Sequence, residues 1–102
     1  MDDESFVLMG ALWFRPDGGA EKYDEYLAAA KPFADKHGLG PNNEYVPVET
    51  IRGDLTPDLV FFNEHPSEEG FTALRQDPGY RAVVALREEA VERQYVLKLR
   101  RK

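Results

Sequence analysis

Two stretches of this sequence are apolar at nearly every position, and they constrain the fold more than any other feature. They are the run Phe6–Trp13 and the run Leu59–Phe62. Side chains of a strand alternate between its two faces, so each run would form a strand that is apolar on both. Such a strand belongs in the middle of a sheet, with a layer packed on each side. The second run continues through polar residues to His65. This predicts a strand over Leu59–His65 whose C-terminal end carries polar side chains.

The rest of the chain predicts helices and two less apolar strands. Apolar residues recurring on one face, together with capping residues, predict helices at Ala20–His37, Glu68–Gln76 and from Pro78 to about Glu92. The remaining strands are predicted at Glu44–Arg52 and Arg93–Arg100. Pro47 cannot donate to a sheet ladder, and the last strand is polar on one face, so both are expected at sheet edges.

The order of these elements predicts the fold class. Strand, helix, strand, strand, helix, strand, with the two apolar strands central, is an α+β ferredoxin-like βαββαβ fold with a four-stranded antiparallel sheet. Helices cover only one face of such a sheet, so the second apolar face predicts a homodimer, a two-fold dimeric α+β barrel. We expect one domain over residues 1–102, with a core at 5–100 and frayed termini.

Composition narrows the classes of function. A net charge of −6 argues against binding to nucleic acids or to anionic membrane surfaces. The chain has no cysteine, and its two histidines lack short ligand spacing, so we predict no metal and no cofactor. The acidic start, Met1–Glu4, is unlike a signal peptide, and the apolar run Phe6–Phe14 is too short to span a bilayer, so we expect a cytoplasmic protein.

Arg87 is the most informative charged residue. It lies near the centre of the apolar face of the helix that begins at Pro78, and a buried guanidinium needs an anionic partner. One interpretation is a ligand-binding clamp for a substrate carboxylate or enolate. The other is a structural ion pair with Glu64 or Glu49, or a side chain whose stem reaches the rim of the core.

His65 and Asn63 share one face at the end of the strand, while Glu64 points to the other. His65 is a candidate catalytic acid or base, because its ordinary pKa lies near neutrality. Its structural alternative is to hold the turn into the next helix. Asn63 is a candidate for binding a ligand oxyanion, or equally an amide that satisfies the strand end.

Two further residues are candidates for ligand binding, each with a preferred structural interpretation. His37 ends the apolar face of the first helix, where the helix dipole favours a histidine. Trp13 ends the first apolar strand and would suit an aromatic pocket, but a large aromatic residue is expected more often in the core or, here, in the dimer interface.

Five short motifs occur in the order and spacing of one known domain family. They are Glu21–Tyr26, His37-Gly38, Arg52–Asp54 followed by Pro57, Phe62–Ser67 and Asp77–Tyr80. Along nearly its whole length the chain resembles the uncharacterised domain-of-unknown-function family thirteen-thirty, of the dimeric α+β barrel superfamily. The resemblance implies a ferredoxin-like homodimer and no established reaction, so it assigns no catalytic residue. His65 stands where an aromatic residue such as Phe is more usual.

The residues support two hypotheses from different classes. In the first, the protein is a cofactor-independent enzyme, monooxygenase- or isomerase-like by analogy with the superfamily, acting on a small carboxylate-bearing or planar substrate. Arg87 would bind the anion and His65 would move a proton, in a site between helices and sheet. In the second, the protein is a non-catalytic small-molecule-binding or structural dimer. The sequence does not choose between them.

Overall fold

The computed structural model describes residues 5–102, which form four strands and three helices. In chain order the elements are β1 (Phe6–Phe14), α1 (Gly19–Lys36), β2 (Asn42–Tyr45), β3 (Leu59–His65), α2 (Glu68–Gln76), α3 (Pro78–Ala90) and β4 (Val91–Leu99). The sheet order is β2-β3-β1-β4, with every neighbouring pair antiparallel. This is the ferredoxin-like arrangement, and it confirms the predicted fold class with β1 and β3 at the centre.

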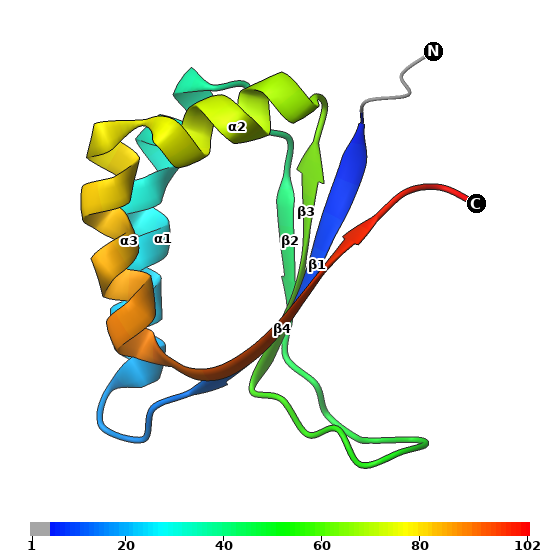
Figure 1. The fold of residues 1–102 in the computed structure, drawn as a ribbon. Helices are drawn as coiled ribbons and strands as arrows, with labels where there is room; N and C mark the ends of the chain where they lie inside the picture. Colours follow the sequence, from blue (N-terminus) through cyan, green and yellow to red (C-terminus); the bar gives the residue numbers. More distant parts are fainter. Residues whose placement is uncertain (1–4) are drawn as a thin grey trace.

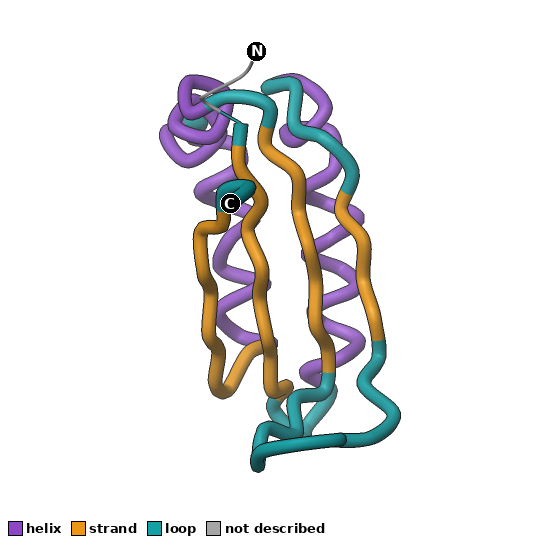
Figure 2. The backbone as a smooth tube through the Cα atoms, turned by 90° about the vertical axis from the view of Figure 1, so that its right-hand side faces the viewer, coloured by secondary structure: helices purple, strands orange, loops and turns teal. Residues whose placement is uncertain are grey.

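The molecule has two layers, a sheet and a layer of helices on one of its faces. Figure 1 shows the helices on one side and a bare sheet surface on the other, and Figure 2 looks onto that bare surface with the helices behind it. Strand register places Leu12 and Leu59 on the inner face, toward the helices. Met9, Phe62 and Leu97 alternate with them and lie on the open face.

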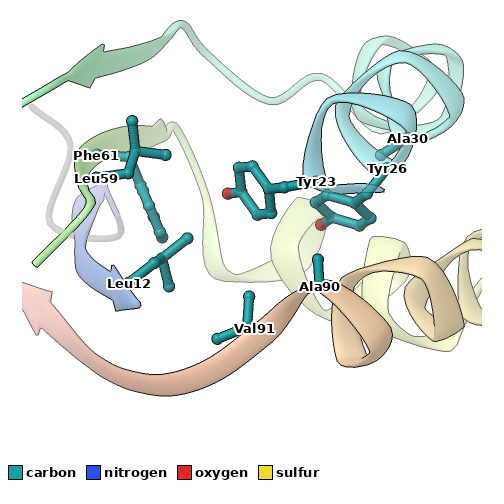
Figure 3. Close-up of a cluster of buried hydrophobic side chains, with 8 residues drawn as sticks. All are labelled: Leu12, Tyr23, Tyr26, Ala30, Leu59, Phe61, Ala90 and Val91. Carbon is teal, nitrogen blue, oxygen red and sulfur yellow. The ribbon is translucent and has the colours of Figure 1, made fainter. Parts of the chain in front are cut away.

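The core joins the inner face of the sheet to α1 and α3. Figure 3 shows its buried members, which are Leu12, Tyr23, Tyr26, Ala30, Leu59, Phe61, Ala90 and Val91. Gly10 lies beneath the ring of Phe61, where an added Cβ atom would stand only 2.1 Å from a ring carbon. A glycine inside a strand marks either a bulge or a close approach by another group, and here it allows the close approach of the Phe61 ring.

The edge strand β2 is much shorter than predicted. It was expected to span Glu44–Arg52 but ends at Tyr45, and residues 46–58 form an exposed loop. The physical reason is the loss of a pairing partner. Tyr45 pairs with Val60, and β3 begins only one residue before Val60, so the residues that follow Tyr45 have almost no strand left to pair with. Asp58 is bound instead to β1, because its backbone N–H donates to the Leu12 carbonyl and its carboxylate accepts from the Phe14 N–H, each at 2.8 Å.

The helix boundaries follow the predicted capping residues. Ser67 accepts a hydrogen bond from the Gly70 N–H and Asp77 accepts one from the Gly79 N–H, so each opens its helix as expected. The first helix continues through Pro32, which lies on its exposed side. At the other end of α3 the helix stops at Ala90 and β4 follows directly, two residues before the predicted boundary.

Candidate functional site

A cavity of about 930 Å³ lies between the inner face of the sheet and the helices. Its walls come from α1, α2, α3 and the inward side chains of all four strands. Apolar residues form much of the wall, among them Leu8, Leu27, Ala30, Phe61, Leu74 and Val84. A cavity of this size is suited to a small ligand, and its polar side chains would fix the orientation of that ligand.

Arg87 stands at one end of this cavity without an acidic partner. The residue is half-buried on α3, and its Nη1 donates to Oε1 of Gln94 on β4 at 2.7 Å. Within residues 5–102 it makes no ion pair, so the predicted pairing with Glu64 or Glu49 is not formed. The guanidinium therefore faces a cavity and a neutral amide.

Tyr23 and Glu44 belong to the same end. Burial raises the pKa of the Tyr23 hydroxyl to about 12, although the charge of Arg87 and a hydrogen bond with it pull that pKa downward. Tyr23 is therefore a hydrogen-bond donor at neutral pH. Glu44 projects from β2 into the cavity, and burial raises the pKa of its carboxyl group against the lowering effect of its hydrogen bond from Asn42.

Two tyrosines meet in the middle of the helical wall. The hydroxyls of Tyr26 on α1 and Tyr80 on α3 are 2.6 Å apart. Burial first, and then the neighbouring Tyr80, raise the pKa of Tyr26, so this hydroxyl also stays protonated. The pair ties the two helices together and leaves hydroxyl groups on the cavity wall.

His65 occupies the opposite end of the cavity. Its side chain is only 2% exposed, stacks on Phe6 with ring centroids 4.8 Å apart, and meets the edge of Phe71 at the same distance. Burial lowers its pKa to about 4, with Glu68 opposing that change and Lys98 adding to it. The imidazole is therefore neutral at pH 7, and neither ring nitrogen has a hydrogen-bond partner in the described part of the chain.

The structure brings Arg87 and His65 to one cavity but not to one point. Gln94, the partner of Arg87, lies opposite Leu12, which pairs with Leu59, whereas His65 is six residues further along the same strand. At about 3.3 Å per residue, the two ends are about 20 Å apart along the sheet. A single ligand could touch both residues only through its two ends.

The other residues predicted as candidates divide between the cavity and the outside. Asn63 lies on the cavity wall between the two ends, and its amide makes only a long hydrogen bond, 3.5 Å, to the Pro41 carbonyl. His37 is outside the cavity, where its Nε2 is 2.8 Å from a carboxylate oxygen of Asp77.

Trp13 also lies outside the cavity, on the open face of the sheet. Its ring meets the edge of Tyr95 at 5.7 Å between centroids, and the guanidinium of Arg93 stacks over it at 4.5 Å. These contacts follow the interface interpretation of the residue rather than the pocket interpretation.

Sequence reasoning missed the tyrosines, Glu44 and Gln94 as cavity residues. The period of the first helix places Tyr23 and Tyr26 on its inner face, but the pattern treats them only as apolar side chains. A signal was available, because a buried tyrosine must find a partner for its hydroxyl. Glu44 and Gln94 carried no such signal, since which strand face turns toward the helices is settled only by tertiary packing.

Neither a metal site nor a membrane-spanning element emerges from the described part of the chain. Among residues 5–102, no three acidic or histidine side chains come together as metal ligands would. None of the helices in this range combines the length and the apolar character that crossing a bilayer requires.

Fold and cavity together define a ferredoxin-like α+β protein with a ligand-sized space between sheet and helices. The chain belongs to the family described as a domain of unknown function, DUF1330, whose model matches residues 18–98. No curated protein matches it. This membership confirms the resemblance found in the sequence motifs and assigns no reaction.

Solved structures share the fold over nearly the whole chain. The methylated form of RPA0582, a protein of unknown function from Rhodopseudomonas palustris, is 26% identical with a TM-score of 0.87, over 97% of this chain and 82% of that one. A dimeric ferredoxin-like protein of unknown function from Jannaschia sp. is 12% identical with a TM-score of 0.79, over 95% and 99%. A protein from Bacteroides thetaiotaomicron, whose name proposes an antibiotic biosynthesis monooxygenase, is 12% identical with a TM-score of 0.73, over 99% and 92%.

The buried imidazole predicts a specific dependence of stability on pH. The pKa of His65 is about 4 in the folded protein and about 6.5 when unfolded, so between these values the unfolded chain binds a proton that the native state does not. Stability present above pH 6.5 is therefore lost as the pH falls toward 4, by up to about 3 kcal/mol. His65→Phe should remove this contribution, so the variant gains stability relative to the wild type as the pH falls.

Urea unfolding of both proteins at a series of pH values between 7 and 4 measures this difference. The acidic residues titrate in both proteins and cancel in the comparison. Parallel stability curves for the wild type and His65→Phe would contradict the neutral, buried state of the imidazole.

Proposed function

We propose that the cavity binds a small carboxylate-bearing molecule with an apolar or planar body, and that Arg87 holds the carboxylate. The observation that carries this proposal is the absence of any acidic partner for the half-buried Arg87 among residues 5–102. A guanidinium in a partly apolar wall is stabilised most by a bidentate carboxylate. A ligand would supply that group, and the protonated hydroxyl of Tyr23 would donate beside it.

Removing the guanidinium tests the proposal. Arg87→Met keeps the length of the side chain but loses the charged hydrogen bonds, which contribute about 1.5–3 kcal/mol. We expect affinity for carboxylates to fall by about tenfold to a hundredfold. Calorimetry with a panel of aromatic and aliphatic carboxylates measures this, with the matching primary alcohols as neutral analogues.

Arg101→Met is the control, because it removes one exposed positive charge outside the cavity lining and should change affinity by less than about twofold. Equal carboxylate binding by the wild type and Arg87→Met would contradict the clamp.

A second candidate function, cofactor-independent proton transfer, rests on Glu44. Its side chain lines the same end of the cavity as Arg87 and Tyr23, and partial desolvation raises the pKa of its carboxyl group, which makes the carboxylate a better base. The carboxylate would take a proton from the carbon next to a substrate carbonyl. The electron pair of the broken C–H bond would pass into the carbonyl, and Arg87 and Tyr23 would hold the resulting enolate oxygen. Return of the proton completes an isomerase-like exchange.

Deuterium exchange distinguishes this enzyme from a binding protein. Incubated in D₂O with 2-oxo carboxylates, the wild type should speed replacement of the hydrogen next to the carbonyl, as followed by NMR. Glu44→Gln should lose about 10²–10⁴-fold of that rate and keep the affinity. Binding without exchange in the wild type would leave the protein as a non-catalytic binder.

We also propose that a second copy of the chain covers the open face of the sheet. That face carries large apolar side chains in water, including Tyr95 (45% exposed) and Leu97 (56% exposed). The loop 46–58 projects toward the same side in Figure 1, with Val48 at 95% exposure. Patches of this kind mark association surfaces. The relatives from Jannaschia sp., Thermobifida fusca and Bacteroides fragilis are described as dimeric.

Charge placed on the open face should separate the two copies. Leu97→Glu is tolerated by the single chain, because the side chain is exposed there, but it would be buried in the dimer without a partner. We expect the wild type to be a dimer at micromolar concentration by light scattering, and Leu97→Glu to be a monomer. Val48→Asp tests in the same way whether the loop reaches the partner.

Ala28→Glu, on the exposed side of α1, is the control and should remain dimeric. A monomeric wild type would overturn the proposed assembly.

A further inference from the structure

The buried end of the cavity contains polar atoms that the protein leaves without partners. A neutral imidazole has one donor and one acceptor, and both nitrogens of His65 lack a hydrogen bond within residues 5–102. Both have almost no accessible surface, so a partner from the cavity reaches them only with a small shift of the ring. Buried polar groups in native proteins are nearly always paired, so an exception points to a group that comes from outside the chain. Stacking does not explain the residue, since a phenyl ring would fill the same space between Phe6 and Phe71.

The same cavity connects this end with the Arg87 end. Both residues contribute to its wall, about 20 Å apart along the sheet. The wall between them is mainly apolar, with Leu8, Leu27, Ala30 and Phe61, and its hydroxyl pair, Tyr26 and Tyr80, is already hydrogen-bonded. Between the ends, the amide of Asn63 makes only a long hydrogen bond, while Arg87 at one end lacks an acidic partner and His65 at the other lacks any hydrogen bond within residues 5–102.

We infer that the ligand is elongated, with a carboxylate at Arg87, an apolar body along the cavity and a terminal hydroxyl that hydrogen-bonds to His65. A hydroxyl suits this position because it both donates and accepts, and therefore matches either tautomer of the imidazole. The inference rests on the proposed carboxylate binding and adds the class of ligand, a carboxylic acid hydroxylated at its far end. A buried water on the imidazole is the competing occupant.

Pairs of probes that differ only in the terminal hydroxyl test this inference. Calorimetry would compare octanoate, dodecanoate and hexadecanoate with their ω-hydroxy forms, on the wild type, His65→Phe and Arg87→Met. At one chain length the hydroxyl should raise wild-type affinity by about three- to tenfold, the worth of one hydrogen bond. His65→Phe should bind both members of that pair equally, and Arg87→Met should weaken both by the same factor.

The outcomes separate this inference from the proposed function. If the hydroxyl gives no advantage at any length, or the advantage persists in His65→Phe, water or nothing occupies the imidazole and the inference is overturned. If none of the aliphatic probes binds, the inference is overturned too. Binding of the aromatic carboxylates to the wild type and Arg87→Met tests the proposed role of Arg87 independently. Should His65→Phe not fold, the ¹⁵N shifts of the wild-type imidazole decide. They should move with ω-hydroxydodecanoate and not with dodecanoate, and equal shifts would contradict the inference.

Discussion

The structure depends on one asymmetry, which is that helices cover a single face of a sheet whose central strands are apolar on both. On the covered face, Leu12, Leu59 and Phe61 pack against α1 and α3 and build the core. On the open face, apolar side chains such as Leu97 remain in water. The proposed assembly and the proposed ligand binding would therefore use opposite faces of the sheet. A second copy on the open face would leave the cavity intact, and a ligand in the cavity would not compete with that copy.

The polar groups of the cavity differ in how fully the chain satisfies them. The hydroxyls of Tyr26 and Tyr80 bind each other, so this pair stabilises the packing of the two helices. Among residues 5–102, Arg87 has only neutral partners, and the ring nitrogens of His65 have no hydrogen-bond partner. Partners of this kind would have to come from a ligand, because an unpaired buried group costs stability that a bound partner restores. The two ends therefore set what the cavity can bind, while the middle holds the fold together.

Local signals predicted most of the fold. The central strands apolar on both faces, the caps Ser67 and Asp77 and the edge position of β2 are all present, although β2 ends at Tyr45, before Pro47. The predicted length of the strand at Glu44–Arg52 was wrong. Its apolar residues have the pattern of a strand, but Asp58 is bound to β1, so the residues after Tyr45 have no strand to pair with. For the site, the periodicity of α3 placed Arg87 on an inward face, whereas no pattern in the chain predicted that Gln94 and Tyr23 would meet it.

By itself, the sequence determined the class of fold, the order of the strands, the apolar second face of the sheet and the position of Arg87 on a buried helix face. These follow from periodicity and capping, which act within a few residues. Tertiary structure decided that the helices cover the face carrying Asn63 and His65, that Arg87 lacks an acidic partner, and that it lies about 20 Å from His65. Such facts depend on how separate elements are placed against one another, and packing over long sequence separations settles them.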